Sequence, residues 1–230
     1  MEITLLRIFL TPILVLTIYL LQKKWGARAG GLFLGLPINI TPFLIIIHLQ
    51  ESNEFLKDAI HGVFVGQIVL LIFAYAYSRL ATRLNWWLTI TLVTLITLSS
   101  SLMLHYLNLS FSITLSVTFI LYLVVRKTWP KTSAISNWQE PTNWDLPFRL
   151  VVTSLTVFLL TTFSNLLGPI VSGTFSAYPI ILTFLGSLSH RRSGPSHILK
   201  TLQGMTYSLP LSYAIFIFIL VIIWWLISFL

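Results

Sequence analysis

Charged residues are scarce in this chain of 230 residues. Asp, Glu, Lys and Arg together make up 9% of it, whereas hydrophobic residues make up 56%. A soluble domain usually carries about 25% charged residues, so this chain has too little polar surface to cover a water-soluble globule. No segment is long and polar enough to form a separate soluble domain. The sequence therefore predicts an integral membrane protein with a single membrane domain.

Cysteine is absent, which excludes disulfides, thiolate nucleophiles and cysteine metal sites. The nucleotide-binding patterns GxGxxG and GxxxxGK[ST] are also missing, as is the GxSxG turn of serine hydrolases. Histidines and carboxylates do not cluster at the short spacings that metal sites need. We therefore expect neither an enzyme nor an ATP-driven pump, and we expect no cofactor and no metal.

Long hydrophobic runs fill most of the chain. Because lipid cannot satisfy open backbone groups, each run long enough to cross a bilayer should be a helix. We expect about eight transmembrane helices, with a tight turn near Asn108 between the fourth and the fifth. The expected segments are residues 4–22, 32–50, 56–79, 86–105, 109–125, 147–167, 169–189 and 198–228.

The net charge of +8 follows this topology. With eight crossings, every Lys and Arg except Arg7 and Lys57 falls on one side of the membrane. The positive-inside rule makes that side cytoplasmic, so the charge indicates cytoplasmic loops rather than a nucleic-acid partner. Both termini then lie on the outer, periplasmic side of what we expect to be a bacterial inner membrane.

The two halves of the chain share a glycine–proline spacing. Gly31 precedes Pro42 by eleven residues, and Gly168 precedes Pro179 by the same distance. An apolar run, a polar loop and the opening of the next helix follow each proline in the same order. This order indicates an internal repeat.

The helix after each proline carries a second match. In the first half Gly62 is followed four residues later by Gly66, and in the second half Gly204 is followed by Ser208. Helices 1–3 therefore resemble helices 6–8, and because five crossings separate them the two repeats have inverted topology. We expect a 3+2+3 arrangement in which repeat one covers about 1–82, linker helices about 84–126, a cytoplasmic loop about 127–146, and repeat two about 147–230.

Inverted repeats are a recurrent plan of secondary transporters, whose substrates bind near the midplane where helices are interrupted. In helices 2 and 7 we expect such interruptions, because Pro37, Pro42 and Pro179 remove backbone donors and Gly35 and Gly173 relax the backbone. An exposed helix N-terminus at a break suits a carboxylate or phosphate. The polar residues expected to bind substrate there are Asn39, Thr41, Thr174, Ser176 and Tyr178. Kinks that serve helix packing alone are the alternative.

Arg7 and Arg149 occupy matching positions near the start of the first helix of each repeat. A guanidinium at membrane depth is a functional candidate, and its planar fork suits carboxylate or phosphate. We expect both to be charge partners of the substrate. Alternatively, Arg7 reaches the outer interface or pairs with Glu2, and Arg149 faces the cytoplasm.

Gly62 and Gly66 form a close-packing motif, which we expect to serve packing within the chain rather than a dimer. One turn above it stand Asp58 and His61, the best candidates for a proton relay. A solvated outer helix end is the alternative that we prefer for this pair.

These observations favour a small secondary transporter or exporter of a small, anionic solute that works by alternating access. Two other functions stay open: a lipid-handling protein, either a flippase or a headgroup-binding enzyme, and a non-catalytic membrane subunit of a larger complex. The expected partners are the lipid bilayer and a small-molecule solute, with no nucleic acid. The small size is compatible with a homodimer.

Overall fold

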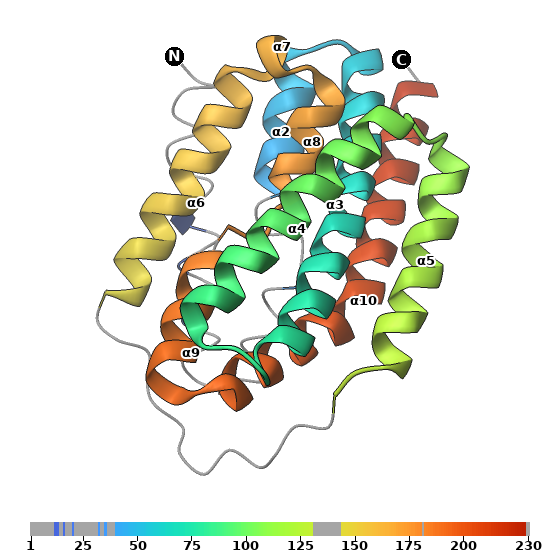
Figure 1. Ribbon diagram of the computed structural model, residues 1–230. Coiled ribbons are helices and arrows are strands. Elements are labelled where there is room, and N and C mark those ends of the chain that lie inside the picture. The colour runs from blue at the N-terminus through green and yellow to red at the C-terminus, as the bar shows by residue number, and fades with distance from the viewer. Residues whose placement is uncertain are drawn as a thin grey trace.

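The computed structural model describes residues 12, 13, 16, 20, 32, 35, 40–130, 144–180 and 182–228. Every element in this part of the chain is a helix, and Figure 1 shows the helices gathered into one bundle. The predicted all-α fold is confirmed for these residues, while the predicted segment 4–22 falls almost entirely outside them. The helices are α2 (Ile40–Gln50), α3 (Asn53–Leu80), α4 (Trp86–Leu107), α5 (Phe111–Lys127), α6 (Asp145–Thr162), α7 (Ser164–Leu167), α8 (Pro169–Ser176), the π-helical turn η1 (Leu182–Gly186), α9 (Ser187–Ser193) and α10 (Pro195–Ser228).

The predicted third, fourth, fifth and eighth segments correspond to α3, α4, α5 and α10, with ends that differ by at most three residues. Capping side chains set several of these ends. Ser52 Oγ accepts a hydrogen bond from Phe55 N at 3.2 Å, and Asn85 Oδ1 accepts one from Leu88 N at 3.1 Å. Such caps satisfy N–H groups that have no partner inside the helix. Asn108, in the left-handed conformation with a φ of 41°, ends α4 and forms the predicted tight turn.

The second, sixth and seventh segments differ from single helices. α2 begins only at Ile40, and its third residue is Pro42, a position where proline fits because the first-turn N–H groups have no acceptor within the helix. The sixth segment is divided into α6 and α7 at Phe163. The seventh is divided into α8, η1 and α9, and its helical pattern stops after Ser176.

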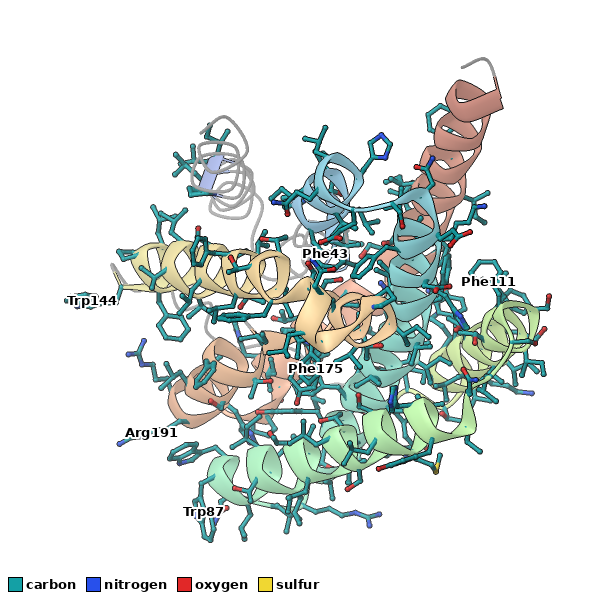
Figure 2. All side chains as sticks on the ribbon, turned by 90° about the horizontal axis from the view of Figure 1, so that it is seen from above. Phe43, Trp87, Phe111, Trp144, Phe175 and Arg191 are labelled. Carbon is teal, nitrogen blue, oxygen red and sulfur yellow. The ribbon has the colours of Figure 1, made fainter. Side chains whose placement is uncertain are left out.

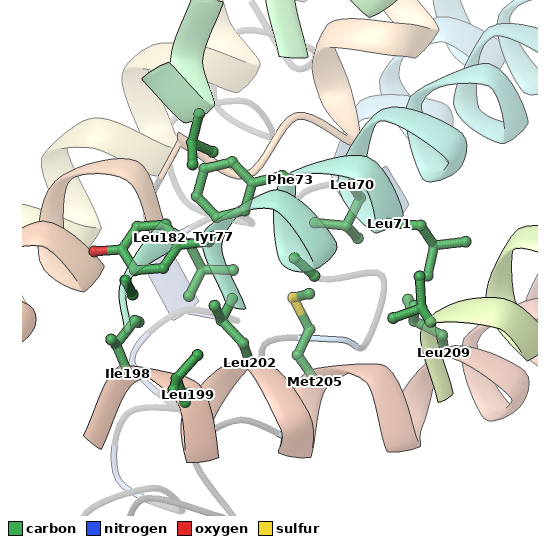
Figure 3. Close-up of a cluster of buried hydrophobic side chains, with 14 residues drawn as sticks. Leu70, Leu71, Phe73, Tyr77, Leu182, Ile198, Leu199, Leu202, Met205 and Leu209 are labelled. Atoms are coloured by element: carbon green, nitrogen blue, oxygen red, sulfur yellow. The ribbon is translucent and has the colours of Figure 1, made fainter. Parts of the chain in front are cut away.

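α3 is the central helix of the bundle, because α2, α4, α5, α8 and α10 all pack against it. Its contact with α10 forms the largest apolar cluster, in which the two helices run antiparallel (Figure 3). Burying apolar side chains of this size contributes about 1.5–3 kcal/mol each. The labelled members are Leu70, Leu71, Phe73 and Tyr77 from α3, Ile198, Leu199, Leu202, Met205 and Leu209 from α10, and Leu182 from η1.

The charged residues divide between the two ends of the bundle. At the end where α3 begins lie the acids Glu51, Glu54 and Asp58, together with the base Lys57. The opposite end, called here the basic end, is where α3 and α5 finish and where α9 and α10 meet. It carries Arg79, Arg83, Arg126, Lys127, Arg191, Arg192 and Lys200.

Within the part of the chain that the structure describes, two helices, α3 and α4, are long and apolar enough to cross a membrane. They differ in burial: 78% of the most apolar stretch of α3 is buried inside the bundle, but only 22% of that of α4. In Figure 2 the labelled Trp87 and Trp144 lie at the periphery, whereas Phe43 lies among the helices. Exposed apolar side chains continue along α4 and α5, including Leu95, Leu98, Leu102, Met103, Phe119, Ile120 and Leu123.

Candidate functional site

The seventh segment is interrupted between α8 and η1. After Ser176 the backbone makes short turns, with Tyr178 N donating to Phe175 O at 3.1 Å and Ile180 N donating to the Tyr178 carbonyl at 2.8 Å. Pro179 has no N–H to donate, and the helix resumes in the wider π form of η1. Single π-helical turns are frequent at functional sites. Residues 177–180 therefore depart from regular helical geometry. They do so beside Gly66, in the buried middle of α3.

Tyr178 connects this interruption to α4. Its hydroxyl lies 3.0 Å from Thr97 Oγ1. Because the Thr97 hydroxyl already donates to the Val93 carbonyl at 2.9 Å, Tyr178 is the donor in this pair. Tyr178, predicted as a substrate contact, is thus half-buried and engaged with α4 in this conformation.

The closest helix crossing joins α3 and α8 through glycines. A Cβ added at Gly66 would lie 2.6 Å from the Thr174 carbonyl oxygen, and one added at Gly173 would lie 2.8 Å from Val63 N. Only glycine permits two backbones to approach this closely. The prediction that Gly62 and Gly66 serve packing within the chain is confirmed. Gly173, expected to mark the break, lies inside α8 instead. Glycine occurs there because the close contact with α3 leaves no room for a side chain.

Two predicted substrate contacts, Thr174 and Ser176, are buried on α8 beside this crossing. The Thr174 hydroxyl donates to the backbone carbonyls of Gly62 at 3.1 Å and Ile170 at 2.8 Å. Its proton is therefore already used in hydrogen bonds within α8 and between α8 and α3. The Ser176 hydroxyl donates to Gly173 O at 2.7 Å and keeps its own lone pairs for an incoming donor.

Gly35, ahead of α2 in the chain, packs on α10. Gly35 is a buried turn residue, and a Cβ there would lie 2.5 Å from the Met205 carbonyl oxygen and would meet Ser208 Oγ. Thr41, predicted as a substrate contact, is half-buried in the first turn of α2. The predicted residues Pro37 and Asn39 lie outside the described residues.

The two predicted arginines are not placed. Arg149 belongs to α6, but its side chain and the whole of Arg7 lie outside what the structure describes. Their role as charge partners of a substrate stays a prediction.

The predicted proton-relay residues, Asp58 and His61, do not bond to each other. Asp58 is exposed near the start of α3, which fits a solvated helix end. His61 Nε2 lies 3.1 Å from Thr114 Oγ1 of α5, and its ring packs edge-on against Phe111. This arrangement ties α3 to α5, and the proton-relay role of Asp58 and His61 stays a prediction.

Several polar groups in the interior have no hydrogen-bond partner within the described part of the chain. The amide oxygen of Gln67 lies in the middle of α3, and the hydroxyls of Ser172, Ser212 and Tyr213 come from α8 and α10. Buried polar groups are almost always paired. Gln67 is not among the site residues predicted from the sequence, although a lone amide in the middle of an apolar helix is a signal of a functional site.

A buried histidine lies toward the basic end. His190 of α9 is buried, and its Nδ1 lies 3.3 Å from the hydroxyl of Tyr77 on α3. Burial lowers the pKa of His190 below its ordinary value of 6.5, and it lowers that of His197 in the same direction. His190 is therefore neutral at pH 7 and serves as a polar link between α9 and α3.

The searched residues contain no group of three His, Asp or Glu side chains that could hold a metal ion. Comparison with protein-family models, curated proteins and solved structures finds no significant match for this chain. The function is therefore argued from the geometry and chemistry of the chain itself.

Proposed function

We propose that the chain is an integral membrane protein that carries a small polar solute across a bacterial inner membrane. Its binding site lies at the interrupted second and seventh predicted segments, residues 32–50 and 169–189. The observation that carries this proposal is the interruption after Ser176. It lies beside the central helix α3, next to buried polar groups without partners. Irregular backbone at membrane depth is tolerated where protein buries it or where it lines a cavity.

The membrane location is supported by the exposed surface of α4. A helix of 22 residues is about 33 Å long, and the hydrocarbon core of a bilayer is about 30 Å thick. In a soluble protein a helix this apolar would be buried in the core, yet α4 is mostly exposed. Lipid contact resolves this conflict, because acyl chains cover apolar side chains without cost. The division of charges between the two ends of the bundle agrees with the predicted topology, in which the basic end is cytoplasmic.

The inverted repeat is supported by the way its halves cross. Gly66 of the first repeat lies against Thr174 of the second. Ser208, the expected counterpart of Gly66, lies against Gly35 of the first repeat. Gly35 thus touches the long helix of the second repeat, much as Thr174 touches that of the first, which is the kind of relation that an inverted repeat predicts. Two such bundles can rock about a shared centre.

The absence of cysteine makes labelling the direct test. In alternating access, a single cysteine introduced by Ser176→Cys should react with a membrane-impermeant maleimide in proteoliposomes, because water reaches the site when it opens. Leu98→Cys is the matched control: it lies at a similar depth on the exposed face of α4, where we expect lipid and no labelling. Ser110→Cys, at the exposed start of α5, gives the rate for a fully accessible thiol.

The three rates separate the possible functions. Labelling of Ser176→Cys well above that of Leu98→Cys supports a solute path through the interrupted helix. Equal, negligible labelling of both would refute that path and would favour the non-catalytic subunit. Fast labelling of Leu98→Cys would refute the assignment of α4 to the lipid. Protection of Ser176→Cys by added lipid headgroups alone would favour the lipid-handling function.

A further inference from the structure

Gln67 lies on α3 between a position that contacts α8 and a position in the apolar cluster with α10. On a helix, residues four apart lie on the same face, so Gln67 is in line with Val63 above it and Leu71 below it. The backbone of Val63 is in close contact with Gly173 of α8. Leu71 belongs to the apolar cluster with α10 (Figure 3). The Gln67 side chain is thus directed into the space between α8 and α10.

The contact between α3 and α10 fixes the level of this space. The rings of Phe64 and Tyr213 stack with centroids 6.3 Å apart, and one to two turns further along, Leu71 and Leu209 belong to one cluster. Because the helices are antiparallel, Gln67, three residues after Phe64, is level with the part of α10 about three residues before Tyr213, near Pro210. Ser212 lies less than one turn from that level.

Ser212 lies on the side of α10 that meets Gly35, because it follows by four residues Ser208, which touches Gly35. Its neighbour Tyr213 stacks on Phe64 of α3, and Leu209 belongs to the apolar cluster shared with α3. Ser212 is thus on α10 beside the part of α3 that carries Gln67.

Each of the two side chains carries a buried oxygen without a hydrogen-bond partner in the described part of the chain. Gln67 is 2% exposed and its Oε1 has no hydrogen-bond partner, and Ser212 is 0% exposed and its Oγ has none, among the residues that the structure places. An unpaired polar group destabilises a folded protein far more than an apolar residue of the same shape. For packing alone, leucine or methionine at 67 and alanine at 212 would be better. These two polar groups are therefore explained by a partner that binds between them.

We propose that Gln67 and Ser212 are the hydrogen-bonding centre of the solute site, and that they bind a hydroxyl group of a small polyol or hydroxy acid. This inference rests on the proposed transport function and names its substrate class. Gln67 Oε1 can only accept a hydrogen bond, whereas Ser212 Oγ can donate one. A solute hydroxyl, which donates once and accepts, satisfies both atoms. An ammonium group would need a carboxylate, and the described carboxylates of α3 lie at the far end of the helix.

The test is a thermal-shift measurement on the full-length protein in detergent, with probes in matched pairs that differ by a hydroxyl: malate against succinate, lactate against propionate, and glycerol against 1,3-propanediol. A ligand that binds only the folded protein raises the melting temperature according to its concentration over its Kd. We expect the hydroxylated member of at least one pair to shift the native protein more strongly. In Gln67→Met the affinity for that member should fall about tenfold, while the affinity for its deoxy partner should change little. Gln203→Met, a half-buried glutamine of α10, is the matched control and should bind as the native protein does.

A second readout needs no ligand. Without solute, Gln67→Met should melt at a higher temperature than the native protein, because it removes an unpaired buried amide. A lower melting temperature would show that the amide is a structural partner and would overturn the inference.

The remaining outcomes are equally decisive. If a solute stabilises the native protein without preference for the hydroxyl, or equally in Gln67→Met, this inference fails while the transport function stands. If no probe of either kind shifts the native protein although Ser176→Cys labels from water, the hydroxyl-bearing class is wrong and the solute path remains. If labelling fails as well, both proposals fall together.

Discussion

The crossing of α3 and α8 gives the sharpest prediction, the replacement Gly173→Ala. The added Cβ would lie 2.8 Å from Val63 N and would also meet the carbonyl oxygen of Ala59, whereas ordinary van der Waals contact begins at 3.4 Å. Both obstructing atoms belong to the backbone of a buried helix, so no side-chain rotation relieves the overlap. α8 must therefore move away from α3 along its whole contact.

The size of the effect follows from two opposing terms. Overpacking a close-packed site typically destabilises by about 1–3 kcal/mol, and the backbone obstruction places Gly173→Ala toward the upper end. Alanine is a better helix former than glycine by about 0.5–1 kcal/mol, which offsets part of the loss. We expect a net destabilisation of about 2 kcal/mol, which for a chain of this size lowers the melting temperature by roughly 4–8 °C.

The assay is thermal unfolding of the purified protein, followed by intrinsic tryptophan fluorescence, with Gly186→Ala as the control. A Cβ at Gly186 would meet only Ile198 Cδ1 at 2.9 Å, the end of a flexible side chain that can move aside. This variant should melt within about 2 °C of the native protein. The reasoning is refuted if Gly173→Ala melts as the native protein does, or if the two variants are destabilised equally.

Three further predictions follow from single contacts. Because burial lowers the pKa of His190, the unfolded chain takes up a proton below pH 6.5 that the folded chain resists, so stability should fall as pH drops below 6.5 and stay flat above it. Melting curves of His190→Gln should show a smaller fall, and an unchanged pH profile would contradict this. Tyr178→Phe should destabilise by about 0.5–1.5 kcal/mol through its lost bond to Thr97, and a double-mutant cycle with Thr97→Val that is strictly additive would argue against it. Gly35→Ala should lower the melting temperature as Gly173→Ala does, because it meets the Met205 backbone; a harmless substitution would count against the inverted repeat.

The sequence was sufficient to predict the continuous helices, whose regular geometry tertiary packing does not interrupt. The ends of α3, α4, α5 and α10 follow from apolar runs and from capping residues such as Asn85 and Asn108. It was less informative where proline and tertiary contacts compete. Pro42 and Pro179 pointed to irregular backbone, but no local signal gives the π form of η1 or the division at Phe163. These features depend on what packs against the helix, and one sequence does not contain that information.

For the candidate site, the structure adds what the sequence lacks, namely the hydrogen-bond partner of each polar side chain. Selecting hydroxyls near the prolines led to Thr174 and Tyr178, which the structure engages in helix packing. It passed over Gln67, because the amide lies far along the chain from either proline and only the crossing of three helices reveals what it faces. Which polar side chain in a helix is satisfied, and which is not, is a property of its neighbours.

The glycine face of α3 has a consequence for biosynthesis. Gly62 and Gly66 are made about 110 residues before Gly173, and at the usual rate of about 5–20 residues per second the partner helix follows roughly 5–20 s later. During that interval the glycine face of α3 has no α8 to cover it, and small-residue faces of this kind are surfaces through which membrane helices associate. The arrival of α8 therefore covers this face and completes the packing of the central helix.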